Sequence, residues 1–181
     1  MISSTREGGR AWVVGNDLNT DMLAPGFAMK LGIEGIARHC LEAVDPAFAT
    51  GVQRGDVLVG GRNFGTGSSR EQAVGVLLHL GIAAVVAVSF AGLYYRNAFN
   101  LGLPLLVCPE AGTIRAGDRV AVDLDAARVH NLTQGVVLTC EPVPPHLLEM
   151  VREGGLLALL EKRIKSGAVR SAPTGRAPDA A

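Results

Sequence analysis

Apolar residues in the middle of the chain change their spacing twice, from a continuous run to a helical period and back to a run. The first run, Asp56–Gly60, favours a short buried strand. After a glycine-rich loop, apolar residues recur at helical spacing over 68–80, and Gly81 stands where a glycine often ends a helix. A second run, Ala83–Val88, predicts another strand. Strand, helix and strand in this order predict a parallel βαβ unit with a right-handed crossover.

The same patterns predict further elements on both sides of this unit. We expect one α/β domain over residues 1–165, because the sequence shows no internal repeat and no interdomain linker. Residues 166–181 are small and polar and include proline, which predicts a disordered tail. The further predicted elements are strands at Ala11–Val14, Leu103–Cys108, Gly117–Leu124 and Gly135–Thr139, and helices at Ile33–Leu41, Phe90–Leu101, Pro144–Val151 and Gly155–Lys165.

The loop before the central helix, GTGSSRE at 65–71, is the strongest candidate for chemistry. Ser68 and Glu71 fit the capping-box pattern, so we expect Ser68 at the N-cap of that helix. The glycines let the backbone approach a ligand, helix amino-terminal amides attract anions, and Arg70 adds a planar donor fork that suits carboxylates. Together they predict a site for a small anion with two hydroxyls beside it. The alternative is that Ser68 only caps the helix while Arg70 is a solvated surface charge.

Other binding motifs are absent or incomplete. The loop is no Walker A motif, since no lysine follows its last glycine, and it matches neither GxGxxG nor the GxSxG nucleophile elbow. Asp17, Asn19 and Asp21 imitate the start of a calcium loop, but Met22 and Ala28 occupy the positions that need glycine and glutamate. Turn side chains that bond locally are the better interpretation. The four histidines show no spacing typical of metal ligands.

Charge and cysteine content narrow the choice of partners and location. With 17 basic and 17 acidic residues, the net charge is zero, so we expect neither nucleic acid nor an anionic membrane as a partner. The longest apolar stretch is too short to span a bilayer, and the first residues lack the apolar core of a signal peptide. Cys40, Cys108 and Cys140 are widely spaced and odd in number, which predicts neither a disulfide framework nor a metal knuckle. A reducing, cytoplasmic location is expected.

Several motifs, in order along the chain, resemble those of a known family. NFGTGSSREQA at 63–73 and AVSFAGLYYRNAFNLGLPLL at 87–106 closely resemble the signature of 3-isopropylmalate dehydratase small subunits, which are homologous to the swivel domain of aconitase. NDLNTDMLAPG at 16–26 is similar to an early turn of that family, and the segment 141–163 resembles its C-terminal helices. The resemblance covers roughly residues 11–165.

The resemblance implies a swivelling β/β/α domain of a hydro-lyase that acts only with a large aconitase-like subunit. The implied reaction, as in leucine biosynthesis, removes water from a malate-type hydroxy-dicarboxylate or tricarboxylate and returns it in the swapped position. In the family, the first serine of GSSR is the catalytic base, here Ser68, and the next two residues, here Ser69 and Arg70, contact a substrate carboxylate. The leaving hydroxyl needs a Lewis acid. Since this chain has no cysteine cluster, we expect the [4Fe-4S] cluster on the large subunit and no metal on this chain.

Two departures from the family pattern concern Thr66 and the loop after Pro25. The family often has cysteine where Thr66 stands, a position without a chemical role in this interpretation. After Pro25 the family usually shows a pattern such as P-x-R-Y-L, whereas Phe27, Met29 and Lys30 follow here, in a loop that faces the variable group of the substrate. Phe27 and Met29 favour an alkyl group, as in 3-isopropylmalate or 2,3-dimethylmalate. Lys30 would instead suit the distal carboxylate of a homoaconitase substrate, or simply extend to solvent.

A non-catalytic module that binds small carboxylates is the alternative from a different class of protein. The two hydroxyls beside Arg70 favour the enzyme, because carboxylate capture alone needs no base next to the arginine. An enzyme that acts without a partner is disfavoured, since the sequence shows no metal site, no Cys–His pair and no catalytic triad.

Overall fold

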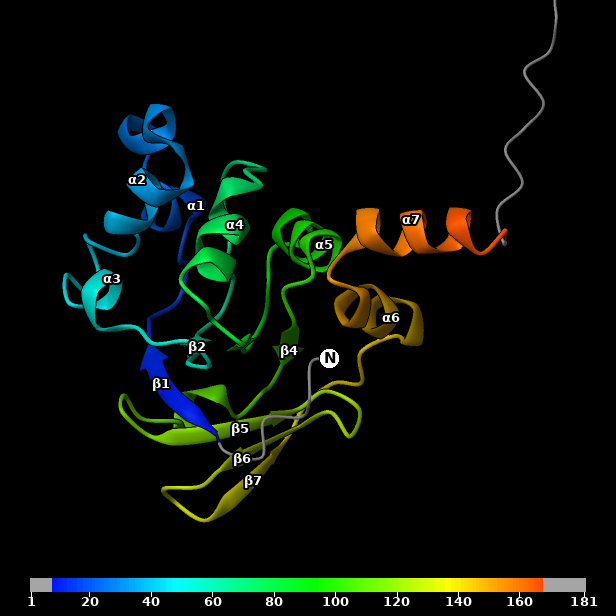
Figure 1. Ribbon diagram of the computed structural model, residues 1–181. Helices are drawn as coiled ribbons and strands as arrows, with labels where there is room; N and C mark the ends of the chain where they lie inside the picture. Colours follow the sequence, from blue (N-terminus) through cyan, green and yellow to red (C-terminus); the bar gives the residue numbers. More distant parts are fainter. Residues whose placement is uncertain (1–7, 168–181) are drawn as a thin grey trace, which may run out of the picture.

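The computed structural model describes residues 8–167, and Figure 1 shows its helices gathered above a strongly curved sheet. Within these residues, seven strands form one mixed sheet in the order β4-β3-β2-β1-β5-β6-β7. The strands are β1 (Gly9–Val13), β2 (Val57–Gly60), β3 (Ala84–Ala87), β4 (Leu105–Val107), β5 (Arg119–Asp123), β6 (Arg128–Asn131) and β7 (Val136–Thr139). The helices are α1 (Thr20–Leu23), η1 (Gly26–Leu31, 3-10), α2 (Gly32–Arg38), α3 (Phe48–Gly51), α4 (Gln72–His79), α5 (Gly92–Leu101), η2 (Ala111–Thr113, 3-10), α6 (Pro145–Glu153) and α7 (Leu156–Lys165).

The parallel half of the sheet, β1 to β4, lies between two apolar layers. In β2, Leu58 packs against the helices, whereas Val57 and Val59 pack against the antiparallel strands β5 to β7. In β3 the same alternation separates Val85 from Val86. Because both faces are covered, every residue of β2 and β3 is buried, which explains their continuous apolar runs. Helices, parallel strands and antiparallel strands are the three layers of the expected β/β/α domain, and the predicted parallel βαβ centre is confirmed.

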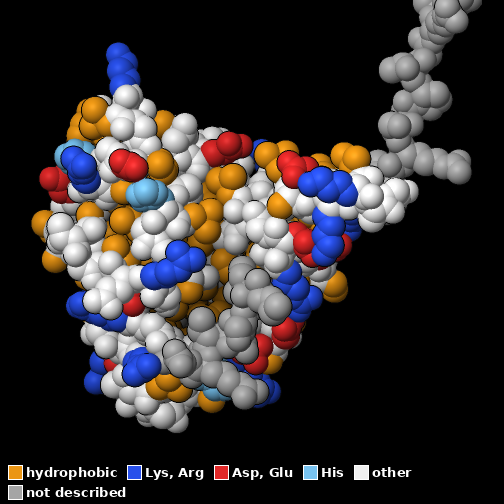
Figure 2. Space-filling model, in the orientation of Figure 1, with side chains coloured by type: hydrophobic (Ala, Val, Ile, Leu, Met, Phe, Trp, Pro, Cys, Tyr) orange, Lys and Arg blue, Asp and Glu red, His pale blue; other side chains and the backbone are white. Residues whose placement is uncertain are grey.

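The surface carries charges of both signs. On the face shown in Figure 2, Lys and Arg side chains lie among Asp and Glu rather than in a patch of one sign. No helix in the part of the chain that the structure describes is long and apolar enough to cross a membrane.

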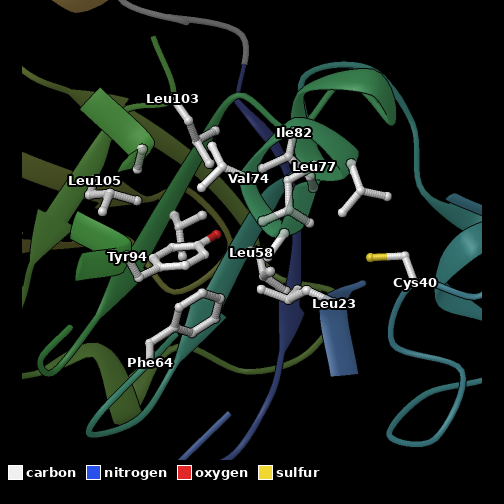
Figure 3. Packing of buried hydrophobic residues seen from close by; sticks show 14 of the residues in the cluster. Leu23, Cys40, Leu58, Phe64, Val74, Leu77, Ile82, Tyr94, Leu103 and Leu105 are labelled. Carbon is white, nitrogen blue, oxygen red and sulfur yellow. The ribbon is translucent and has the colours of Figure 1, made fainter. Parts of the chain in front are cut away.

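The helix-side core fixes α4 and α5 above the sheet. Figure 3 shows Leu58 and Leu105 of the strands beside Val74 and Leu77 of α4, with the ring of Tyr94 from α5 next to them. These side chains are almost completely buried. Their packing places the loop that joins β2 to α4 at one rim of the sheet.

The sheet curls so far that its two outermost strands meet. The backbone N–H of Glu141, two residues after β7, donates to the carbonyl of Val107 in β4 at 2.8 Å. The thiol of Cys108, next along the chain from β4, donates to the carbonyl of Thr139 at 3.9 Å. The outer side of β4 is therefore covered by the segment at the end of β7.

The central helix starts later than the capping-box pattern predicts. α4 begins at Gln72 and not at Ser68, its N-cap residue is Glu71, and no side chain caps it. The backbone N–H of Arg70 instead donates to the carbonyl of Ser68 at 2.8 Å, a turn too tight for an α-helix. The prediction of a Ser68–Glu71 capping box is therefore wrong, and Ser68 lies on the loop.

The other predicted strands and helices are present, most with narrower bounds, while β6, α1, α3, η1 and η2 were not predicted from the sequence. In β6 only Val129 is a buried apolar residue, so the sequence shows no alternating pattern there. Its place is set by pairing with β5 and β7 on either side. The predicted disordered tail lies, from residue 168 onward, outside the described residues.

Candidate active site

Three loops meet at the carboxyl ends of the parallel strands β1, β2 and β3. The N–H of Gly65 donates to the carbonyl of Leu18 at 2.7 Å, and the N–H of Thr20 donates to the carbonyl of Thr66 at 2.8 Å. On the other side, the N–H of Phe64 donates to the carbonyl of Ser89 at 3.0 Å. Ligands of open parallel sheets bind at this end of the strands, so the loop with Ser68 is in the expected place for a site.

Polar side chains of the early loop hold this arrangement together. Asn16 accepts a hydrogen bond from the N–H of Arg62 through Oδ1 at 2.8 Å, and Asp17 accepts one from Nδ2 of Asn63 at 2.9 Å. Asn19 caps α1 by accepting from the N–H of Met22 at 3.0 Å. These side chains therefore stabilise turns and join two loops. Within residues 8–167, no group of three His, Cys, Asp or Glu side chains lies close enough to hold a metal ion.

Gly65 brings the loop into close contact with α5. Its φ is +83°, and a Cβ atom there would lie 2.2 Å from Cγ of Tyr94. Tyr94 also packs its ring edge against Phe64, with centroids 5.3 Å apart. Only glycine fits between the loop and this buried ring. The glycine spacing of the sequence thus reflects a packing need at Gly65.

Ser68 is exposed, and within the described residues its hydroxyl makes no hydrogen bond. Ser69 is also exposed, but its Oγ accepts a hydrogen bond from Nδ2 of Asn97 at 3.3 Å. Asn97 lies on α5 and is only 6% exposed, so its amide is held in place by the core. Sequence reasoning missed Asn97, because the contact joins residues far apart along the chain.

Arg70 is fixed by contacts that sequence reasoning also missed. Its Nη1 pairs with Oδ1 of Asp21 and donates to the carbonyl of Ala24 at 3.1 Å. Nε and Nη2 have no partner in the described part of the chain. The guanidinium is thus anchored through one nitrogen, while two donors are available for a carboxylate. A solvated surface charge, the alternative weighed from the sequence, would not be held in this way.

The segment after Pro25 forms η1, and its three candidate specificity residues point to different surroundings. Phe27 is 70% exposed and contacts the ring of His39 edge-on, with centroids 5.0 Å apart. Phe27 and Asp21 both line a mostly apolar hollow of about 420 Å³ next to the Arg70 contact. Met29 packs against the helix-side core, and Lys30 is exposed. The structure therefore brings Phe27, but not Met29, to this hollow.

Two buried acidic groups beneath the site stay protonated near neutral pH. Burial raises the pKa of the Cys40 thiol to about 12. Burial, and to a lesser extent Cys40, also raises the pKa of Tyr94, whose hydroxyl has no hydrogen-bond partner among the described residues. Neither group can supply an anionic base to the site. The exposed hydroxyls of Ser68 and Ser69 stand two residues and one residue before Arg70 along the chain.

Similarity to known proteins shows the class of protein to which this chain belongs. The family model of the aconitase C-terminal domain matches residues 33–110, the span that contains β2, α4, β3, α5 and the loop with Ser68. A 3-isopropylmalate dehydratase small subunit from Moorella thermoacetica is 43% identical over 160 residues, which cover 87% of this chain and 96% of that protein. The chain belongs to the family of 3-isopropylmalate dehydratase small subunits, as its sequence motifs indicated.

Other relatives include a second 3-isopropylmalate dehydratase small subunit and one small subunit that is named for a different activity. The 3-isopropylmalate dehydratase small subunit 1 of Thermotoga maritima is 42% identical over 85% of this chain and 94% of its own length. A methanogen homoaconitase small subunit from Methanothermobacter thermautotrophicus is 40% identical over 88% of this chain and 93% of its own length. The crystal structure of 3-isopropylmalate dehydratase from Methanocaldococcus jannaschii has a TM-score of 0.83 and 39% identity, and covers 89% of this chain and 98% of that one.

Proposed function

We propose that this chain is the small subunit of a two-subunit hydro-lyase that isomerises 3-isopropylmalate by dehydration and rehydration, a step of leucine biosynthesis. Family membership carries the reaction class. The observation that supports the site is the unbonded hydroxyl of Ser68, two residues before an arginine that is anchored through Nη1 alone. A loop of this kind presents a base and a carboxylate clamp together.

In this proposal Ser68 exchanges the proton and Arg70 holds the substrate. The Ser68 oxygen, as an alkoxide, takes the proton from the carbon next to the one that carries the hydroxyl, and the two bonding electrons form the double bond as the hydroxyl leaves. On rehydration the same oxygen returns a proton. A serine alkoxide needs nearby positive charge, which Arg70 provides. The amino end of α4 contributes less than the sequence suggested, since Glu71 precedes the first helical residue.

Ser69 and Arg70 would bind one carboxylate of the substrate. Arg70 can offer Nε and Nη2 as a parallel pair of donors while Nη1 remains on Asp21 and Ala24. Ser69 accepts from Asn97, so the hydroxyl proton of Ser69 is directed to another acceptor. A substrate carboxylate would supply that acceptor.

The large subunit would supply the remaining chemistry. We propose that it carries the [4Fe-4S] cluster, which acts as a Lewis acid on the leaving hydroxyl when present. Two observations support this proposal: relatives of this chain are named small subunits, and the described residues of this chain bring together no group of metal ligands.

Replacement of Ser68 tests the proposal directly. Ser68→Ala in the complex reconstituted with the large subunit should lower kcat by about 10³-fold or more, as loss of a base typically does. Ser89→Ala is the comparison variant: its Oγ accepts a hydrogen bond from the N–H of Asn63 at 2.9 Å but has no chemical role in this scheme, so it should lower kcat far less. Near-normal kcat in Ser68→Ala would remove Ser68 from the catalytic role. Substrate binding without turnover in the wild-type complex would instead favour a non-catalytic carboxylate-binding module.

A homoaconitase-like or dimethylmalate-dehydrating subunit is the second candidate. Exposed Lys30 on η1 favours a substrate with a distal carboxylate, and one close relative is named a homoaconitase small subunit. Phe27 at the apolar hollow favours an alkyl group instead. Values of kcat/KM for 3-isopropylmalate, 2,3-dimethylmalate and homocitrate, with and without Lys30→Ala, distinguish them. A preference for homocitrate that disappears in Lys30→Ala would overturn the alkyl assignment.

A further inference from the structure

Two buried thiols meet where the curved sheet closes. Cys108 directly follows β4, Cys140 directly follows β7, and their exposed fractions are 0% and 5%. Both are free thiols, and Sγ of Cys108 donates to the carbonyl of Thr139, the residue before Cys140, at 3.9 Å. Cys40, the third cysteine, is also buried, but it belongs to the helix-side core on the other face of the parallel strands.

The backbone around this pair holds the two cysteines in place. The N–H of Cys108 donates to the carbonyl of Ala87 at 2.8 Å, and the N–H of Cys140 donates to the carbonyl of Ala127 at 2.9 Å. Next to them, the N–H of Glu141 donates to the carbonyl of Val107 at 2.8 Å. Each cysteine thus lies in a segment that is held by backbone hydrogen bonds, and both side chains pack in the same apolar cluster.

We propose that Cys108 and Cys140 are a redox-active pair, a modification site at which hydrogen peroxide links β4 to the end of β7 through a disulfide. Nothing in the reaction proposed for Ser68 requires these thiols, which lie on the opposite face of the parallel strands from the helices. The pair is therefore a separate chemical site of the same chain.

The two thiols differ in acidity in the way that such a reaction needs. The hydrogen bond from the Cys140 side chain holds the pKa of Cys108 below its usual value, against the opposing effect of burial. The same hydrogen bond, together with burial, raises the pKa of Cys140. Cys108 is therefore the thiolate that reacts first, since the thiolate is the nucleophile. Cys140 is the thiol that resolves the intermediate.

The steps balance with peroxide as the only oxidant. The Cys108 thiolate attacks one peroxide oxygen, the O–O bond breaks, and the hydroxide that leaves takes up the proton lost by Cys108 to form water. The sulfenic acid on Cys108 is then attacked by the sulfur of Cys140, the S–O bond breaks, and the second water leaves with the proton of Cys140. Two electrons pass from the two thiols to the peroxide.

Peptide mapping of the full chain tests this proposal. The purified chain is treated with hydrogen peroxide, denatured, alkylated, digested without reductant and analysed by mass spectrometry. We expect two of the three thiols to escape alkylation, one peptide pair joined through Cys108 and Cys140, and complete reversal by dithiothreitol. The thermal unfolding midpoint should rise on oxidation, because the link constrains the unfolded chain. Full alkylation of all three thiols, or links only between chains, would overturn the proposal.

Variants separate this pair from general oxidation of buried thiols. Cys40→Ala is the matched control and should keep the cross-link, since Cys40 is equally buried but packs in the other apolar cluster. Cys140→Ser keeps a hydrogen-bond donor beside Cys108, so it should lose the cross-link and leave a sulfenic acid on Cys108 that dimedone labels. A cross-link to Cys40, or dimedone labelling of Cys140 in place of Cys108, would contradict the assigned order. The wild-type map decides the proposal even where a variant fails to fold.

Discussion

Arg70 shows how a single side chain can be both structural and available to a ligand. Nη1 is held by Asp21 and by the carbonyl of Ala24, while Nε and Nη2 have no partner within residues 8–167. The loop pattern in the sequence predicted that Arg70 binds a carboxylate. It could not predict Asp21 or Ala24 as its partners, because these contacts depend on how two loops meet.

A lysine at position 70 should bind the substrate more weakly than Arg70 does. Arg70→Lys offers one ammonium group for both the anchor and the substrate, so we expect KM to rise by about 10- to 100-fold with a smaller change in kcat. Steady-state kinetics of the reconstituted enzyme measure both constants. Arg62→Lys, at an exposed arginine of the same loop, should leave both unchanged. An unchanged KM in Arg70→Lys would show that Arg70 does not hold the substrate.

A side chain at Gly65 should disrupt the packing of the loop on α5. Gly65→Ala puts Cβ against Tyr94 at a positive φ, so we expect the free energy of unfolding to fall by about 2–4 kcal/mol. Gly92→Ala is the matched control, because a Cβ there meets nothing within 4 Å, and it should change stability by less than about 1 kcal/mol. Denaturant unfolding gives both values. Equal effects of the two substitutions would refute the packing role of Gly65.

Among secondary-structure elements, the buried parallel strands were the most predictable from sequence. β2 and β3 are covered on both faces, so their apolar runs are continuous and short. β6 was missed because its position depends on pairing with distant strands and not on its own pattern. The predicted start of α4 at Ser68 was wrong. The Ser68–Glu71 pattern is local, whereas the anchoring of Arg70 to Asp21 is a tertiary contact that the pattern does not contain.

Asn19, which caps a helix, and Ser68, which only fits a capping pattern in the sequence, make a testable contrast. Asn19 caps α1 through a hydrogen bond from the N–H of Met22, so Asn19→Ala should cost about 1 kcal/mol and lower Tm by about 2–4 °C. Ser68 caps no helix, so Ser68→Ala should leave Tm almost unchanged. Thermal unfolding by circular dichroism compares the two. A loss of Tm in Ser68→Ala as large as that in Asn19→Ala would restore the capping role.

At the scale of the whole molecule, the candidate site lies open at one rim of the sheet. Ser68 and Ser69 are exposed, and the described residues bring together no metal-ligand group. We therefore expect the purified chain to show no iron–sulfur absorbance and no turnover, and activity to appear on addition of the large subunit. Visible spectra and dehydratase assays of the chain alone and of the complex measure this. Turnover by the isolated chain after metal removal would contradict a divided site.

A subunit that assembles with a separate chain is present without that chain for some time after synthesis. Sheets with an uncovered outermost strand can then recruit strands from other chains and aggregate. In this protein the outer side of β4 is occupied by the chain's own Thr139–Glu141 segment, through the contacts of Val107 and Cys108. The curvature of the sheet thus removes one route to self-association. Before it binds the large subunit, the chain does not expose the outer side of β4 to pairing with another chain.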